Sequence, residues 1–570
     1  DEEDEEDEEK EEEEEEEGGR GGYNSPSTTA LRFRLDKGPV ALTTRRSSAL
    51  PKDNRKERVA VAEEGDESGA CSAAYSSLNN RLLSAREREI NRMKRRAAAS
   101  IPAAADESSP SSGDGEGSGA QGDDFLDTYF GVSAAVMWNL VYTPAEEGPV
   151  VPVSRGWNKV LDPVVDDFQY VIFEWDNFFA SLVSSTLGYT DIAVSNIIQT
   201  VKSITAAGFV PNYSAAGIKS EDRTEPPIGA KVLEALIEGN GGFSSSPPRS
   251  SSSSGLEWVA ELLVDDLIRW NEWMFDNRQK EGLIALGSYS IEKVLNKGQG
   301  ADDNNMQAAR FESGLDNSPM YDGEDFYNSS KEAHTMELWD VGFSSLFAAD
   351  SLALGRILTR INRTTEARFF TERGEAMARE IYARLWDDQS EAFVNRFFNG
   401  SFNRRVTPTS FYPLLLVGHV PTETMDGGSS SIGRNINQLL HSWFFNSSRF
   451  CVAPDGDFVK NNDTCYWGLP SISADDPAFP ALGYWRGFVW GPMAQIVFWA
   501  LEAAAKTGPE FASARRAKIA LAKQHQQLML SQWRKHRHIC ENYSPHKVAD
   551  DCTGDPFYTW GALTGLLSFQ

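Results

Sequence analysis

Apolar residues recur at helical spacing along most of the chain after residue 124. Repeats at positions i, i+3, i+4 and i+7 place side chains on one face of an α-helix. Strand-like alternation is limited to short pieces, at 169–173 and 391–396. The clearest helical stretches are 258–275, 341–361, 364–385 and 490–506. The pattern predicts an all-α domain of successive amphipathic helices, and neither a TIM barrel nor a β-sandwich fits its bulk.

Clusters of aromatic and polar residues stand where one predicted helix ends or the next begins. Two examples are FEWDNFF at 173–179 and GYWRGFVW at 483–490. A closed ring of paired helices, with a pocket lined by the connecting loops at one end, accommodates this arrangement. Periodicity alone does not establish that the ring closes.

The first 122 residues differ in composition from the rest of the chain. They are rich in Glu, Ser, Gly, Ala and Arg, and residues 1–17 hold sixteen acidic residues and one lysine, which supply −15 of the net charge of −29. A block of like charges repels itself and buries no apolar surface. We expect a disordered region over 1–122 and a folded domain over 123–570. The acidic balance also argues against nucleic acid as a partner.

Five cysteines and seven Asn-x-Ser/Thr sequons bear on the compartment. Cys451 and Cys465, and Cys540 and Cys552, form two close pairs, whereas Cys71 lies in the acidic region. Two local disulfides are expected, with free thiols or a metal site as alternatives. The sequons are at Asn212, Asn328, Asn362, Asn399, Asn446, Asn462 and Asn542. Together these features favour the secretory pathway, in the endoplasmic reticulum lumen or outside the cell, with a cytoplasmic location as the alternative.

No uninterrupted apolar run approaches the roughly 20 residues that a membrane-spanning helix needs. The candidates are broken by charged residues or glycine. We therefore expect no membrane segment.

Two acidic residues in separate motifs are the candidates for chemistry: Asp316 in ESGLDNSP and Glu541 in ENYSP. Cleavage of a glycosidic bond needs one carboxylic acid to protonate the leaving oxygen and a carboxylate on the opposite face of the sugar. From the residues alone, Asp316 also suits a turn, and Glu541 also suits an ordinary surface position. The pair suggests a glycosidase whose fold brings distant segments together.

Seven motifs in the same order resemble glycoside hydrolase family 63, which includes processing α-glucosidase I and mannosylglycerate hydrolases. They are FEWDNFF (173–179), DRTEPPIGA (222–230), ESGLDNSP (312–319), FYPLLLVG (411–418), YWRGFVW (484–490), ENYSP (541–545) and FYTWGAL (557–563). The resemblance covers about 124–570 and implies an (α/α)6 barrel that inverts the anomeric carbon without a metal or other cofactor. Residues 1–122 do not supply the large β-rich domain that precedes the barrel in processing glucosidases.

The resemblance implies that Asp316 is the general acid and Glu541 the general base. An inverting enzyme holds the two carboxyl groups roughly 6.5–9.5 Å apart, so that a water fits between base and sugar. Asp316 must stay protonated near neutral pH, which an apolar wall or the negative charges of Glu312 and Asp322 would favour. A disulfide between Cys540 and Cys552 would hold the loop that carries Glu541.

The same motifs supply candidate sugar-binding residues. Carboxylates accept hydrogen bonds from hydroxyls, indoles cover the apolar face of a sugar ring, and a guanidinium is a fixed fork of donors. For Trp175 and Trp560 the alternative is core packing, for Arg223 a loop salt bridge, and for Arg486 the orientation of a protein carboxylate. The candidates are Trp175, Asp176, Phe179, Arg223, Glu225, Tyr484, Trp485, Arg486, Trp490 and Trp560.

We therefore expect an inverting exo-α-glycosidase that removes terminal α-glucosyl residues from oligosaccharides. A hydrolase of mannosylglycerate or glucosylglycerate is the first alternative. A catalytically silent carbohydrate-binding protein, which would keep the aromatic pocket, is the second.

Overall fold

The computed structural model describes residues 117–143, 148–162, 167–215, 218–238, 255–289, 304–327, 334–420, 431–452, 466, 468–546, 552–553 and 555–570. They all belong to one of two compact units, Met93–Gln570. The first described element, α2 (Gly117–Asn139), begins slightly before the expected domain boundary. The predicted disorder over the first 116 residues falls outside the described residues.

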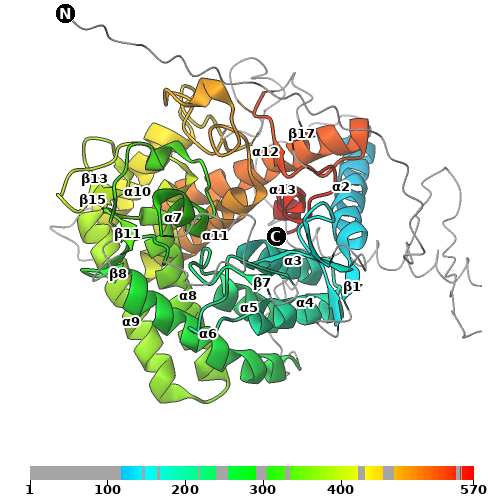
Figure 1. Ribbon diagram of the computed structural model, residues 1–570. Coiled ribbons are helices and arrows are strands. Elements are labelled where there is room, and N and C mark those ends of the chain that lie inside the picture. Colours follow the sequence, from blue (N-terminus) through cyan, green and yellow to red (C-terminus); the bar gives the residue numbers. More distant parts are fainter. Residues whose placement is uncertain are drawn as a thin grey trace, which may run out of the picture. The chain divides into compact units, whose positions relative to one another are not determined.

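Helices dominate the described part of the chain and form two concentric rings (Figure 1). Each helix of the inner ring contacts the next, and the last contacts the first. The inner ring consists of α3 (Glu174–Thr186), α5 (Gly229–Ile237), α8 (Val341–Arg360), η2 (Pro408–His419), α11 (Gly491–Thr507) and α13 (Leu563–Leu566). The predicted closure of the ring is confirmed.

The outer helices pack against the inner ones in the order of the chain. Outer α4 (Thr190–Lys202) packs on α3, α6 (Glu257–Arg278) on α5, α9 (Thr364–Arg384) on α8, α12 (Ala512–His536) on α11, and α2 on α13. Helix α10 (Ser431–Leu439) follows η2 in the chain. The fold is the predicted (α/α)6 barrel.

The four stretches with the clearest helical periodicity correspond to α6, α8, α9 and α11. Helix α8 is also long and apolar enough to cross a membrane, but 94% of its apolar window is buried inside the barrel. It is a core helix of the inner ring. Its first turn is capped by Asp340, whose Oδ1 accepts from the backbone N–H of Phe343 at 2.7 Å.

Glycines allow α8 and α9 to approach closely. A Cβ atom on Gly355 would lie 3.0 Å from the carbonyl oxygen of Ala367, and one on Gly374 would lie 2.8 Å from that of Ala348. Both contacts are with backbone atoms, which cannot move aside as a flexible side chain can. Side chains at these two positions would push the inner and outer rings apart.

One inner element departs from an α-helix. Segment η2 is a 3₁₀-helix with Pro413 in its interior. Proline has no N–H to donate and its ring clashes with the preceding turn of an α-helix, which favours the tighter coil here. The remaining short helices are α7 (Met306–Glu312), η1 (Pro319–Tyr321), η3 (Leu440–Phe444), η4 (Phe479–Ala481), η5 (Pro509–Phe511), η6 (Thr559–Ala562) and η7 (Leu567–Phe569).

The strands are short and pair antiparallel, mostly with the next strand in the chain. Two pairings join distant segments: β12 (Leu338–Trp339) pairs with β15 (Arg396–Phe397) across α8 and α9, and a three-stranded sheet of β5 (Ile172–Phe173), β6 (Tyr213–Ala215) and β7 (Ile218–Lys219) joins the start of α3 to a distant loop. The others are β1 (Val141–Thr143), β2 (Gly148–Val150), β3 (Asn158–Asp162), β4 (Asp167–Tyr170), β8 (Gln279–Lys280), β9 (Leu283–Ile284), β10 (Phe326–Tyr327), β11 (Thr335–Met336), β13 (Trp386–Asp387), β14 (Ala392–Phe393), β16 (Asn542–Tyr543) and β17 (Cys552–Thr553).

Candidate active site

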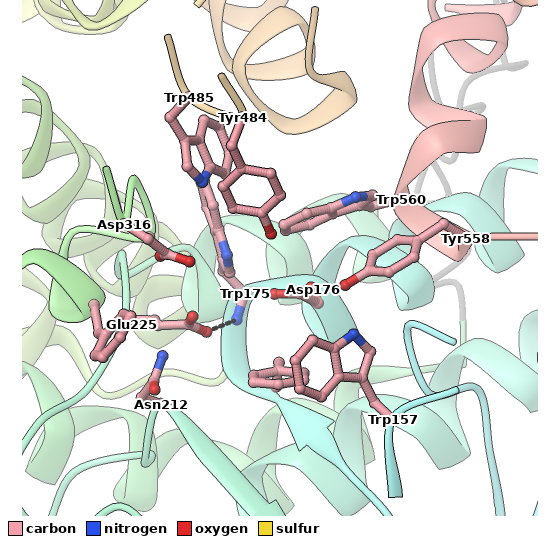
Figure 2. A pocket seen from close by; sticks show the side chains of 13 residues that line it. Trp157, Trp175, Asp176, Asn212, Glu225, Asp316, Tyr484, Trp485, Tyr558 and Trp560 are labelled. Carbon is pink, nitrogen blue, oxygen red and sulfur yellow. Dashed lines mark hydrogen bonds between the residues drawn. The ribbon is translucent and has the colours of Figure 1, made fainter. Parts of the chain in front are cut away.

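A pocket with about 390 Å³ of empty space lies where several inner helices begin (Figure 2). Trp175 and Asp176 stand in the first turn of α3, Glu225 precedes α5, and Trp560 lies in η6 just before α13. The full lining is Trp157, Phe173, Trp175, Asp176, Asn212, Glu225, Phe311, Gly314, Asp316, Tyr484, Trp485, Tyr558 and Trp560. The barrel thus gathers segments from the whole length of the described chain into one aromatic and acidic pocket.

Tryptophans build the wall of this pocket. The rings of Trp485 and Trp490 stack with centroids 3.6 Å apart, and Trp560 meets Trp490 edge-on at 5.5 Å. Trp175 meets Trp560 edge-on at 5.8 Å and rests on buried Phe179 at 5.9 Å. Such aromatic pairs hold one another rigidly and leave flat apolar faces for a ligand.

Asp316 enters the pocket from the loop between α7 and η1. Part of its side chain faces the pocket, but the surrounding protein excludes most solvent from the carboxyl group. This desolvation raises the pKa of Asp316 to about 6, and the charge of Arg223 limits the rise. The expected contribution from Glu312 and Asp322 is not what raises this pKa. Glu312 is paired with Arg278, and Asp322 with Arg486, so their charges are compensated.

Glu541 is buried, and Tyr484 connects it to the pocket lining. The hydroxyl of Tyr484 donates to Oε1 of Glu541 at 2.7 Å. Burial raises the pKa of Glu541 to about 7, the bond from Tyr484 opposes the rise, and the nearby charge of Asp316 adds to it. The backbone oxygen of Glu541 accepts from Nε1 of Trp560 at 3.0 Å. The two candidate catalytic carboxyl groups therefore interact electrostatically.

The loop carrying Glu541 is covalently closed. Cys540 and Cys552 form the predicted disulfide, and strand β16 after Glu541 pairs with β17 at Cys552. Cys451 is also disulfide-bonded, while its expected partner Cys465 lies outside the described residues.

Two further buried acids complete the pocket. Burial raises the pKa of both Asp176 and Glu225, and the charges of the other pocket acids raise it further. Glu225 also accepts from the backbone N–H of Trp175 at 3.3 Å. A carboxyl group with a raised pKa keeps its proton more readily. It can then donate a hydrogen bond to one hydroxyl group of a ligand and accept a hydrogen bond from another.

Four of the predicted sugar-binding residues do not line the pocket. Phe179 and Trp490 lie behind it and support Trp175 and Trp485. Arg223 is buried, pairs with Asp222 at 2.7 Å and covers the ring of Phe311.

Arg486, the fourth, binds Asp322 through both terminal nitrogens, with Nη1 2.9 Å from Oδ2. The alternative interpretation of Arg486, that it orients a protein carboxylate, is therefore the one observed.

Several lining residues were not predicted from sequence. Phe173, Phe311, Gly314 and Tyr558 stand inside or beside the quoted motifs, so proximity to those motifs was a usable signal. Trp157 and Asn212 belong to none of them.

Asn212 was noted only as a sequon. It is buried, and its Oδ1 has no hydrogen-bond partner within the described residues. A buried acceptor of this kind is a place for a ligand donor.

Metal coordination has no candidate in the described ranges: no group of three or more His, Cys, Asp and Glu side chains is arranged to hold an ion. The absence of a cofactor stays a prediction.

Comparison with solved structures shows the fold. A family 63 mannosylglycerate hydrolase from Thermus thermophilus, solved with glucose, matches 77% of this chain and 99% of its own with 17% identity and a TM-score of 0.52. Neutral trehalase from Saccharomyces cerevisiae matches 75% of each chain with 12% identity and a TM-score of 0.50. A search of curated proteins returned no match.

Comparison with family models shows the family. The model of the mannosylglycerate hydrolase MGH1-like glycoside hydrolase domain matches residues 169–561, which is more than half of the chain and includes both candidate catalytic acids. The chain therefore belongs to the MGH1-like glycoside hydrolases of family 63.

Proposed function

We propose that this protein is an inverting exo-α-glycosidase that hydrolyses terminal α-glucosyl residues of oligosaccharides, with Asp316 as its general acid and Glu541 as its general base. The main support is that Asp316 lines an aromatic pocket, that Glu541 is hydrogen-bonded to Tyr484 of the same lining, and that the pKa of both acids is raised. Perturbed acids of this kind, one near about 6 and the other near about 7, suit proton transfer close to neutral pH.

In the proposed reaction, the proton of Asp316 moves to the glycosidic oxygen as the bond from that oxygen to the anomeric carbon breaks. A water molecule gives its proton to Glu541 and its oxygen bonds to the anomeric carbon from the opposite face. The configuration at that carbon is inverted. Tyr484 supports the base because its hydrogen bond favours the ionised form of Glu541.

The pocket offers matched contacts for one sugar ring. Asp176 and Glu225 offer oxygens to hydroxyl groups, Asn212 adds an amide, and Trp485 adds an aromatic face. Trp175 lines the pocket and packs on buried Phe179. A small pocket of this kind suits the end of a glycan chain, which supports exo cleavage.

A small acidic glycoside such as mannosylglycerate or glucosylglycerate is the second candidate substrate. The pocket lining contains no Arg or Lys. A glycerate carboxylate would have to use the guanidinium groups around Asp322, from Arg310, Arg405 and Arg486, whose side chains are 20%, 32% and 24% exposed.

The test is hydrolysis by the purified protein of kojibiose, nigerose, trehalose, a glucosylated high-mannose glycan, mannosylglycerate and glucosylglycerate, with the released sugar followed by NMR. Asp316→Asn and Glu541→Gln are compared with Glu372→Gln, which neutralises an exposed acid on α9. We expect β-glucose to be released by the wild type and by Glu372→Gln, and by neither active-site variant.

The other outcomes separate the alternatives. If the protein hydrolyses only mannosylglycerate or glucosylglycerate, the proposed substrate is wrong and the second candidate is correct. Release of the α-anomer would overturn inversion. Sugar binding without turnover would favour the silent binder, and full activity in Asp316→Asn or Glu541→Gln would overturn that residue's role.

We also infer a secretory location, which the Cys540–Cys552 disulfide supports because such bridges persist in oxidising compartments. Sequons at Asn362 and Asn399 are exposed, whereas those at Asn212 and Asn542 are buried. Glycopeptide mapping of the protein from its own cells should find glycans at the exposed pair. Unmodified exposed sequons with reduced Cys540 and Cys552 would contradict this location.

A further inference from the structure

Asn317, the residue directly after the proposed acid, bonds to the turn that carries Tyr484. Its Nδ2 donates to the carbonyl oxygen of Gly483 at 3.1 Å, and its Oδ1 accepts from the backbone N–H of Trp485 at 2.9 Å. Gly483 and Trp485 are the two neighbours of Tyr484 in the chain. One amide group thus holds the backbone on both sides of Tyr484.

The backbone of this turn needs such support. Tyr484 has φ +59° and Leu482 has φ +44°, in the left-handed region that side chains other than glycine rarely adopt. Conformations of this kind are unfavourable and persist only where the surroundings enforce them. The two hydrogen bonds from Asn317 are interactions of this enforcing type.

Tyr484 connects this turn to the proposed base. Its hydroxyl donates to Oε1 of Glu541 at 2.7 Å, and its ring meets that of Trp490 edge-on at 4.7 Å. The aim of this hydroxyl depends on the backbone from which the ring projects. A shift of the turn would therefore weaken the bond to Glu541.

A second link ties the same two loops together. Arg486, two residues after Tyr484, binds Asp322 bidentately, and Asp322 follows the acid loop at the end of η1. This ion pair is partly exposed, with side chains 24% and 31% accessible, so it contributes less than a buried contact. Asn317 directly follows Asp316 in the chain and bonds to both neighbours of Tyr484, so it is the more direct connection.

We propose that Asn317 is a positioning residue that couples the general acid to the general base: it holds the turn of Tyr484 against the acid loop, and through Tyr484 it sets the position of Glu541. The nitrogen and the oxygen of the Asn317 amide are both bonded to this turn, which supports a positioning role. The coupling rests on the proposed function of Asp316 and Glu541. It means that the separation of the two carboxyl groups is set by one side chain next to the acid.

The test uses Asn317→Leu, which keeps the approximate size and removes both hydrogen bonds, and Asn317→Asp, which keeps the acceptor for Trp485 and removes the donor to Gly483. Tyr484→Phe and the double variant Asn317→Leu/Tyr484→Phe complete a cycle. The matched control is Asn403→Leu, because Asn403 donates to the carbonyl oxygen of Met320 at 2.7 Å on the same segment but does not contact the Tyr484 turn.

We expect Asn317→Leu to lower kcat roughly 10- to 100-fold with a smaller change in KM, as misplacement of catalytic groups does. The decrease in kcat relative to the wild type should become smaller as the pH rises, because Glu541 is deprotonated in every variant at high pH. The double variant should be no worse than about 3-fold below Tyr484→Phe, since both changes remove one interaction. Asn317→Asp should fall between Asn317→Leu and the wild type, and Asn403→Leu should show no pH-dependent loss.

Additive losses in the double variant, or a loss in KM alone, would overturn the coupling. The same pH-dependent loss in Asn403→Leu would assign the effect to general destabilisation of the segment and would overturn it as well. If the wild type is active and Asn317→Leu has the same kcat and KM, only the coupling is overturned. A wild type without activity on any glycoside overturns the proposed function together with the coupling.

Discussion

The hydroxyl of Tyr484 lies 2.7 Å from Oε1 of Glu541 and donates to it. Tyr484 lines the pocket, and Glu541 is buried. A donor bonded to a carboxylate favours its ionised form, and this bond opposes the effect of burial on the pKa of Glu541. Tyr484 therefore connects the pocket lining to the proposed base and favours the ionised form of Glu541.

The pH dependence of the wild type follows from the two pKa values. In the proposed mechanism Glu541 acts ionised and Asp316 acts protonated, so activity should fall at low pH as Glu541 gains a proton and at high pH as Asp316 loses one. With pKa values of about 7 and about 6, the profile of kcat/KM should have a maximum near pH 6.5.

The closeness of these two values has its own consequence. Because burial brings both pKa values close to neutrality, only part of the free enzyme carries an ionised Glu541 together with a protonated Asp316. A profile that keeps rising above pH 8 would contradict the assignment of Asp316 as the acid. The control is the thermal unfolding temperature over the same pH range, which should not follow the activity.

Replacement of Tyr484 by Phe should raise the pKa of Glu541 further, because the hydrogen bond that favours its ionised form is lost. The loss in kcat/KM should be largest below neutral pH and should decline as the pH rises. One lost hydrogen bond to a charged group corresponds to about 1.5–3 kcal/mol, or roughly 10- to 100-fold. Measurement of kcat/KM from pH 5 to 9 checks this expectation, and an equal loss at every pH would contradict it.

Removal of the disulfide with Cys540→Ala and Cys552→Ala should lower both stability and activity. Closing a loop of this kind contributes typically about 2–4 kcal/mol, and Cys540 directly precedes Glu541. We expect a lower unfolding temperature and a fall in kcat that exceeds the change in KM, measured at a temperature where the variant is folded. The double variant is preferred to a reductant because Cys451 is also disulfide-bonded. Unchanged kcat would show that the bridge does not position the base.

Breaking the ion pair between Arg278 and Glu312 should strongly destabilise the protein. Both side chains are fully buried, with Nε 2.7 Å from Oε2, and Glu312 also accepts from the backbone N–H of Gly287 at 2.6 Å. Replacement of Arg278 by Met leaves a buried carboxyl group without its partner, which costs about 3–5 kcal/mol.

The control for this pair lies on the same helix. Arg269→Met removes a pair with Asp266 in which the arginine is 49% exposed, and it should cost less than about 1 kcal/mol. Equilibrium unfolding in urea compares the two variants. Similar small effects would show that the buried pair adds little.

Sequence patterns predicted most of the architecture. Four periodic stretches became α6, α8, α9 and α11, because the spacing of apolar residues determines which helix face is buried. The motif FYPLLLVG was recognised, but its 3₁₀ geometry depends on how Pro413 is accommodated among the neighbouring helices. Periodicity also left ring closure open, since it describes each helix separately and not which helices touch.

The site was predicted in part. Motif resemblance selected Trp175, Asp176, Glu225, Asp316, Tyr484, Trp485 and Trp560, all of which line one pocket. It did not separate lining residues from supporting ones such as Phe179 and Trp490, because both kinds are aromatic and occur in the same motifs. Trp157 and Asn212 were missed because no local pattern marks a residue that only folding brings to the pocket.

By itself, the sequence determined the helical class, the family and the chemical types available at the site, because these depend on residue identity and local spacing. Tertiary structure decided which groups meet. In the folded chain Glu312 pairs with Arg278, and Arg486 pairs with Asp322. The sequon residue Asn212 is buried, and Asn317 bonds to both neighbours of Tyr484. Burial and hydrogen bonding between distant segments set the pKa values of the acids, and no stretch of sequence contains that information.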